Sequence, residues 1–202
     1  MLLLMFRVPL NLYLLAPLLN GSLSSAMVTF PLYYIMREDI SAKEAFSRLG
    51  LEYRGIGPLV KEIIYGVLLL FCMFILLMII GALAMKFGFL DQDKVQEKVS
   101  ALPFYMVVFA IIVAPFTEEV FFRGFLLNRK FLPPIGLLIF SSVIFGISHL
   151  SYGSVYEIAA ALTMGFALGI AALYRKSIIP SITAHLIFNL ISMIAMRSVG
   201  AG

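Results

Sequence analysis

Charged residues are scarce in this sequence. Asp, Glu, Lys and Arg make up 13% of the 202 residues, whereas about 25% is usual in a soluble domain. Hydrophobic residues make up 62%, and the mean hydropathy is +1.04. This composition excludes a soluble globular domain, a disordered chain and a nucleic-acid-binding module, and it leaves an integral membrane protein.

Cysteine is almost absent as well. The single cysteine, Cys72, lies in an apolar run. One cysteine excludes a disulfide framework and a cysteine-based metal cluster. The formal charge of +4 comes from a few charges near the ends of apolar runs and not from a basic patch.

The apolar runs predict an all-α fold, a polytopic membrane bundle of about seven transmembrane helices, with a range of six to eight. A helix needs about 20 residues to cross a bilayer. We interpret residues 1–20 as a retained first span; the alternatives are a signal sequence, or one re-entrant hairpin formed with the second run. The expected spans are 1–20, 23–36, 63–84, 102–129, 135–150, 156–174 and 178–196.

The polar segment 37–62 is predicted to be an interfacial loop that is partly helical around residues 42–49. It carries five basic residues, so the positive-inside rule predicts that it and the N-terminus lie on the cytoplasmic side of the cell membrane. On the same side we expect Arg123, Arg129, Lys130, Arg175 and Lys176, and on the other side Lys86, Lys94, Lys98 and Arg197.

Two adjacent glutamates interrupt the fourth span. A charge inside a membrane costs about 2.5–3.5 kcal/mol on insertion scales, so such residues are candidates for function. Glu119 and Arg123 are four residues apart and can pair on one helix face. Glu118 points about 100° away and has no such partner, so it is predicted to face a cavity. The alternative is a helix that ends near Phe116, with both glutamates at the interface.

The only two histidines, His149 and His185, both lie in apolar spans. Asn189 follows His185 by four residues and shares its helix face. A rise of 1.5 Å per residue places Glu118, His149 and His185 roughly 15, 22 and 12 Å from their predicted cytoplasmic helix ends. These residues are therefore expected at one membrane level; the alternative is that they only join helices by hydrogen bonds.

Two further features are interpreted as structural. Glu157, which follows the polar turn 151–154, is predicted to be interfacial at the start of the sixth span. Gly165 and Gly169 are predicted to let that span pack closely on a neighbouring helix.

A glutamate, two histidines and an amide could activate a water molecule and stabilise an oxyanion. That is the chemistry of peptide-bond hydrolysis without a covalent nucleophile. Other intramembrane protease chemistries find little support in the sequence. It has no His-Glu-x-x-His and no Gly-x-Ser-Gly motif, and its aspartates all lie in predicted loops: Asp39, Asp91 and Asp93.

Three motifs resemble those of the CAAX prenyl endopeptidase family, also called CPBP or Abi, which includes the Ras-converting-enzyme type. They are Glu118-Glu119-x-x-x-Arg123, Phe145-x-x-x-His149 and His185-x-x-x-Asn189. The resemblance covers about residues 100–195 and implies an intramembrane endopeptidase with a cavity that is open to the cytoplasm. By this resemblance, Glu118 and His149 activate the water, and His185 with Asn189 forms the oxyanion site.

The resemblance also implies an internal organisation. Residues 1–100 are expected to form N-terminal membrane helices with the polar loop, and residues 101–199 the catalytic helices, within one integral membrane domain. Glu119, Arg123 and Phe145 are expected to support the site.

The motifs do not determine whether the protein binds a metal or which substrate it cleaves. Glu118, His149, His185 and Asn189 are candidate ligands of Zn²⁺, although we favour a metal-free mechanism. The expected partners are the lipid bilayer and a membrane-associated peptide or protein, with or without a prenyl group, and no nucleic acid. Two alternatives remain: a small transporter or proton relay, against which the absence of inverted repeats counts, and a non-catalytic scaffold or immunity protein of the same fold.

Overall fold

The computed structural model describes residues 16–199, which are helical and contain no strand. Five of the described helices are long and apolar enough to cross a membrane, and the predicted helical membrane bundle is confirmed. The segments are α2 (Ala16–Met36), α3 (Ala42–Arg48), α4 (Ile56–Lys86), α5 (Asp93–Ser100), α6 (Phe104–Val108), η2 (Phe109–Val113), α7 (Ala114–Glu119), η3 (Val120–Phe125), η4 (Leu126–Asn128), α8 (Pro134–Ile147), η5 (Leu150–Tyr152), α9 (Val155–Arg175) and α10 (Ile179–Val199).

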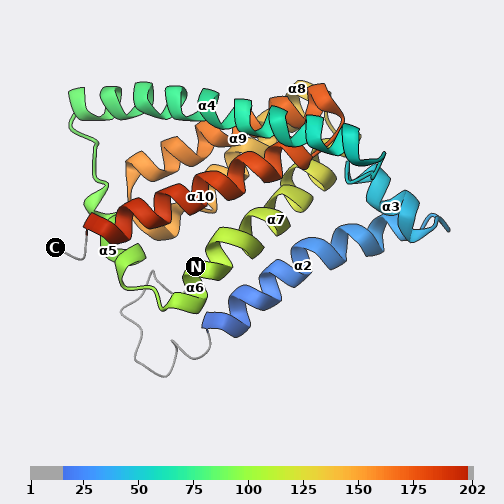
Figure 1. The fold of residues 1–202 in the computed structure, drawn as a ribbon, viewed down its shortest axis with the longest axis horizontal. Helices are drawn as coiled ribbons and strands as arrows, with labels where there is room; N and C mark the ends of the chain where they lie inside the picture. Colours follow the sequence, from blue (N-terminus) through green and yellow to red (C-terminus); the bar gives the residue numbers. More distant parts are fainter. Residues whose placement is uncertain (1–15, 200–202) are drawn as a thin grey trace.

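The helices are stacked in layers (Figure 1). α4 runs along one face and packs on α9 and α10, and α8 packs on α9. α7 lies on the other side of α10, and α2 packs against α7 on the opposite face from α4. The helix that carries the two glutamates is therefore enclosed between α2 and α10.

The close packing of α9 on α8 depends on glycine, as predicted. A Cβ atom on Gly165 would lie 3.0 Å from the Ser142 Cα atom. A Cβ atom on Gly169 would lie 2.5 Å from a methyl carbon of Leu138. Both distances are shorter than normal van der Waals contacts, so this interface cannot take a larger residue at either position without shifting.

The fourth span is one helix that continues past both glutamates, from Phe104 to Asn128. The alternative in which this helix ends near Phe116 is therefore wrong. The span is irregular, because π-helical turns at η2 and η3 flank α7. Pro115 has no N–H to donate, which interrupts the hydrogen-bond ladder, and π-helical turns are frequent at functional sites.

Two boundaries differ from the sequence prediction. α4 begins at Ile56, so the interfacial loop ends earlier than residue 62; Gly55, with a φ of 107°, turns the chain directly into the helix. α2 is continuous through the break predicted between residues 20 and 23. The rest of the first expected span, residues 1–15, lies outside the described residues. The predicted helix around residues 42–49 is confirmed as α3.

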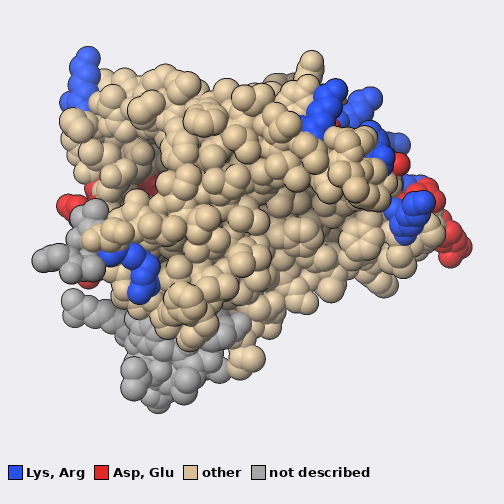
Figure 2. Space-filling model, viewed as in Figure 1, with Lys and Arg blue, Asp and Glu red and all other residues tan. Residues whose placement is uncertain are grey.

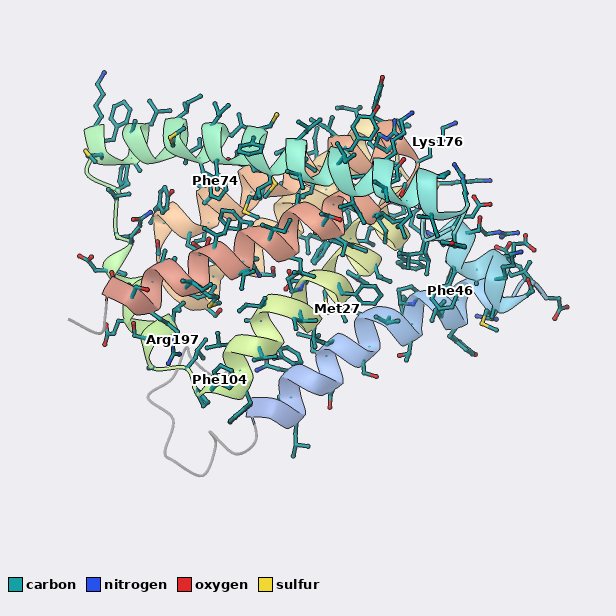
Figure 3. All side chains as sticks on the ribbon, viewed as in Figure 1. Met27, Phe46, Phe74, Phe104, Lys176 and Arg197 are labelled. Atoms are coloured by element: carbon teal, nitrogen blue, oxygen red, sulfur yellow. The ribbon has the colours of Figure 1, made fainter. Side chains whose placement is uncertain are left out.

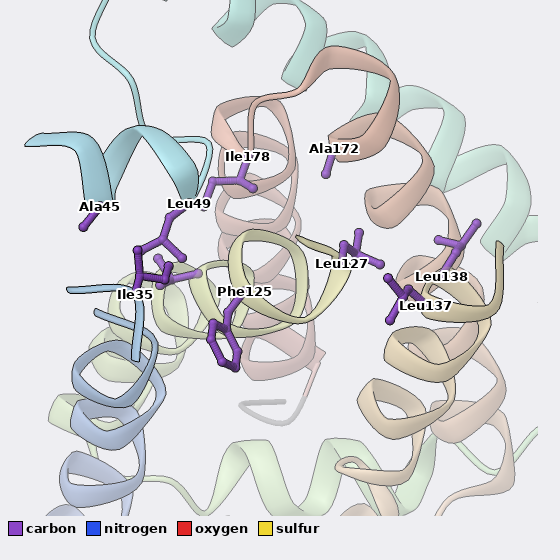
Figure 4. Packing of buried hydrophobic residues seen from close by; sticks show 10 residues of the cluster. Ile35, Ala45, Leu49, Phe125, Leu127, Leu137, Leu138, Ala172 and Ile178 are labelled. Carbon is purple, nitrogen blue, oxygen red and sulfur yellow. The ribbon is translucent and has the colours of Figure 1, made fainter. Parts of the chain in front are cut away.

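A hydrophobic cluster joins the helices at the end of the bundle where α3 lies (Figure 4). α3 covers the ends of α2, η3 and α10, and the Ile178 backbone N–H donates to the Gly50 carbonyl over 3.1 Å. Leu49 is fully buried in the cluster. We call this the α3 end. Its buried members are Ile35, Ala45, Leu49, Val120, Phe125, Leu127, Leu137, Leu138, Ala172 and Ile178.

Most basic residues gather at the α3 end (Figure 2). Figure 3 labels Lys176 there and Arg197 at the opposite end, where α5 lies. We call that opposite end the α5 end. The division of basic residues into two groups at opposite ends of the bundle agrees with the predicted crossings.

Candidate functional site

Three fully buried polar side chains form a cluster between α7, η3 and α10. Glu119, Arg123 and His185 have exposed fractions of 0%, 1% and 2%. One Arg123 terminal nitrogen lies 2.9 Å from Glu119 Oε1, and His185 Nδ1 lies 2.9 Å from the same oxygen. The predicted pairing of Glu119 with Arg123 is confirmed, and the bond to His185 is an addition that the sequence did not indicate.

Because Glu119 Oε1 accepts, the His185 ring donates through its Nδ1–H. This leaves the Nε2 atom of His185 directed elsewhere, as in other carboxylate-oriented imidazoles. Among the described residues, Glu119 Oε2 and Arg123 Nε have no hydrogen-bond partner. Glu119 and Arg123 thus bring one negative and one positive charge into the cluster, and each keeps one polar atom that is not hydrogen-bonded.

Phe145 is the centre around which the cationic and imidazole groups are arranged. Its ring lies 4.4 Å from the Arg123 guanidinium carbon. The His149 ring centroid is 4.9 Å away and the His185 centroid 5.8 Å away. One aromatic side chain, 1% exposed, thus keeps both histidines and the arginine in register, which gives the predicted supporting residue a physical task.

His149 follows the C-terminal end of α8. Its Nδ1 atom lies 2.9 Å from the Phe145 carbonyl oxygen. A carbonyl only accepts, so Nδ1 carries the proton and a neutral His149 presents Nε2 as a lone-pair acceptor. The Ser148 hydroxyl donates to the same carbonyl over 2.7 Å, and this bond accounts for the serine beside the histidine.

Glu118 faces a different environment from Glu119, as the helical geometry predicted. Its side chain is 24% exposed, and its Oε2 atom lies 3.9 Å from His185 Nε2. It lines a cavity of about 370 Å³ between α2, α6, α7 and the end of α8, together with His149. We call this the Glu118 cavity. Met27, labelled in Figure 3 on α2, lines its other wall.

A second cavity of about 560 Å³ lies between α4, α5, α9 and α10. We call it the wide cavity. His149, Asn189 and Glu157 line it, and Phe74, labelled on α4 in Figure 3, forms part of its wall. His149 and Tyr152 line both cavities, so the two spaces meet on opposite sides of these rings.

Asn189 has a structural contact that the sequence did not reveal. Its side-chain N–H donates to the Ala110 carbonyl over 2.9 Å. Ala110 belongs to the π-helical segment η2, in which its carbonyl would accept from residue 115. Residue 115 is a proline and has no N–H. Asn189 thus supplies the donor that Pro115 lacks, and the second N–H of its amide is left for another acceptor.

The residues present do not fit a bound metal ion. Within residues 16–199, no three His, Cys, Asp or Glu side chains lie close enough together to hold one. We therefore derive no step through a metal.

Both cavities lie at the α5 end, and the segment 37–62 lies at the α3 end. We expected the basic loop and the opening of the site on the same, cytoplasmic, side. These two cavities and the basic loop lie at opposite ends of the bundle. A third cavity, of about 430 Å³, lies at the α3 end and is lined by Arg48, Arg123 and Lys176. The sequence could not show this, because hydropathy gives the depth of a residue and not the place where helices separate.

Fold and site together define a polytopic membrane protein with a buried carboxylate–imidazole–guanidinium cluster beside two cavities. Residues 100–191 match the family model described as Type II CAAX prenyl endopeptidase Rce1-like. The match confirms the resemblance given by the three motifs. No curated protein and no solved structure matches the chain.

Proposed function

We propose that the chain is an intramembrane endopeptidase in which Glu118 and His149 activate a water molecule. The observation that carries this proposal is the position of Glu118. Its carboxylate reaches the cavity that His149 also lines, and its Oε2 atom lies 3.9 Å from His185 Nε2. Two atoms at that separation are both within hydrogen-bond reach of one water molecule.

The proton transfers follow from the hydrogen bonds. The oxygen of the water attacks the carbonyl carbon of the peptide, and its proton goes to Glu118 or to the free Nε2 of His149. The same proton is then delivered to the leaving amine nitrogen as the C–N bond breaks. Both acceptors are oriented before substrate arrives, His149 by the Phe145 carbonyl.

His185 and Asn189 are proposed to stabilise the oxyanion. Glu119 accepts from Nδ1 of His185 over 2.9 Å and stabilises a positively charged ring. Such a ring donates through Nε2 toward the negative charge that develops. Asn189 offers the N–H that is not bonded to Ala110. In this scheme Arg123 is the counter-charge of Glu119, and residues 101–199 carry the catalytic groups.

The test is cleavage by purified protein of a membrane peptide with a C-terminal Cys-containing CAAX sequence, prepared with and without a prenyl group. Glu118→Gln should lose at least about 10²-fold in rate and keep its thermal unfolding midpoint. The matched control is Glu97→Gln, which removes an exposed carboxylate of α5 and should cleave like the wild type. Activity of Glu118→Gln equal to the wild type would contradict the assignment.

The charge distribution favours the α3 end as the cytoplasmic one. In a Cys72→Ser background, a membrane-impermeant thiol reagent added to intact cells should then label Lys86→Cys at the α5 end. Lys43→Cys, on α3, should be labelled only after permeabilisation. The opposite pattern would mean that the cavities open to the cytoplasm.

A further inference from the structure

The wide cavity holds one carboxylate, that of Glu157. Every other described residue that lines it is apolar or uncharged apart from the titratable His149. Glu157 lies in the first turn of α9, where the sequence interpretation placed it at the interface. That interpretation did not foresee that the side chain borders the same space as His149 and Asn189.

Helix capping does not explain Glu157. Ser154 and Glu157 have the spacing of a capping box, in which the glutamate would reach back to the first N–H groups of the helix. Here Asp91 takes that place. Its carboxylate accepts from the Ser154 hydroxyl over 2.6 Å and from the backbone N–H groups of Val155 and Tyr156 over 3.1 and 3.2 Å.

No described residue forms a hydrogen bond or an ion pair with the Glu157 carboxylate. The two nearest lysines of α5 are engaged elsewhere: Lys94 with Asp91 and Lys98 with the Ser151 carbonyl. A partly buried carboxylate without a counter-charge is costly, and a cation that enters the cavity would offset that cost. The carboxylate thus gives the wide cavity a preference for positive charge.

The rest of the wall suits a long basic side chain. The methylene stem of lysine or arginine packs on apolar surface while its charged head seeks a polar partner. Four methionines line the wide cavity, and methionine adapts to differently shaped neighbours. They are Met78, Met85, Met193 and Met196.

We propose that Glu157 binds the cationic side chain of a lysine or arginine in the peptide substrate, seated in the wide cavity next to His149. This inference rests on the proposed peptidase function. It makes Glu157 a specificity-determining residue and predicts that substrates carry a basic residue close to the cleaved bond. The methionine wall leaves the remaining side-chain selectivity broad.

The experiment compares membrane peptides that differ at one position, lysine, glutamine or glutamate, in a detergent with an uncharged head group. The wild type should have a KM about 10- to 30-fold lower for the lysine peptide than for the glutamine peptide, the range expected for one charge pair. Glu157→Gln should lose this difference mainly in KM. Glu157→Lys should prefer the glutamate peptide, whereas Glu97→Gln should keep the wild-type preference.

Binding is measured separately from cleavage. The chain has no tryptophan, so the fluorescence of one tryptophan placed in the peptide reports binding without background from the protein. Cleavage of all three peptides with equal KM would overturn the role of Glu157 and leave the peptidase function standing. Charge-selective binding that Glu157→Gln abolishes, without any cleavage, would support the cation site and overturn the peptidase function. Equal binding of all three peptides without cleavage would overturn both.

Discussion

The two ends of the bundle are built in opposite ways. At the α3 end, hydrophobic side chains from α2, α3, η3, η4, α8 and α9 meet in one cluster, and backbone groups contact each other directly between Gly50 and Ile178. The cavity at this end, about 430 Å³, is lined by charged side chains, among them Arg48, Arg123 and Lys176. At the α5 end, α4 stands away from α10, and the two cavities open up between the helices. The candidate site lies around Phe145, at the boundary between the packed α3 end and the α5 end with its two cavities, which we call the hollow end.

This difference teaches how the chain can keep charges inside a membrane. The packed α3 end fixes the positions of α7 and α10, so Glu119, Arg123 and His185 bond directly to one another. In the proposed mechanism, water and substrate reach Glu118 and His149 from the α5 end. Substitutions at the boundary should therefore affect both halves, and substitutions at either end only one.

The largest effect is expected at the boundary. Glu119→Gln leaves the buried Arg123 without its counter-charge and weakens the bond to His185, so we expect a loss of about 3–5 kcal/mol in stability. The measurement is thermal unfolding and yield in detergent, compared with Glu118→Gln. If Glu119→Gln folds normally and Glu118→Gln does not, the division of labour between the two glutamates is wrong.

The second effect concerns Asn189. If its amide meets the oxyanion, Asn189→Ala should lose about 10²–10³ in rate, and Asn189→Asp should be at least as slow because it adds negative charge. Peptide cleavage and bound-metal content are measured for both variants. An active, metal-loaded Asn189→Asp protein would instead indicate an oxygen ligand to a metal.

The bond to Ala110 requires a control for Asn189. Pro115→Ala restores a backbone N–H that can serve the Ala110 carbonyl. If Asn189 only satisfies that carbonyl, the double variant Pro115→Ala, Asn189→Ala should regain activity. If Asn189 also acts on the oxyanion, the double variant should regain stability and stay slow.

The sequence predicted the parts of the site that depend on local spacing. The pairing of Glu119 with Arg123 and the separate environment of Glu118 follow from helical geometry along one segment. The bonds that join distant segments could not be read in this way. His185 to Glu119, and Asn189 to Ala110, depend on how α10 is turned against α7. The π-helical turns around Pro115 shift that orientation. A sequence pattern with the regular α-helical period of 3.6 residues gives no sign of these turns.

The third effect tests the packing at the α3 end. A Cβ atom on Gly124 would lie 2.8 Å from the Leu49 carbonyl oxygen, a backbone atom that cannot move aside cheaply. Gly124→Ala should therefore destabilise the protein by about 1–3 kcal/mol. Gly57→Ala is the matched control, since nothing lies within 4 Å of its Cβ position. Equal unfolding midpoints for the two variants would show that the α3 end is not tightly packed.

The smallest effect is expected at Asp91, the residue whose hydrogen bonds hold neighbouring segments of the α5 end together. Burial alone would raise the pKa of its carboxyl, but the hydrogen bonds from Ser154, Lys94 and the first N–H groups of α9 outweigh burial and lower the pKa below its ordinary value. A carboxyl with a lowered folded-state pKa stabilises the protein above its unfolded pKa, near 3.9, and loses that contribution as the pH falls toward the folded value.

Asp91→Asn removes the charge from the N-terminus of α9, so we expect a loss of about 0.5–2 kcal/mol at neutral pH, the usual worth of a helix cap. The unfolding midpoints of the wild type and of Asp91→Asn should differ by a constant amount from pH 7 down to about pH 4 and converge below it. Asp93→Asn, which changes an exposed residue in the first turn of α5, is the control and should not reproduce this convergence. A difference that stays constant to pH 3 would mean that the carboxylate is not the group that holds α9 to the loop before α5.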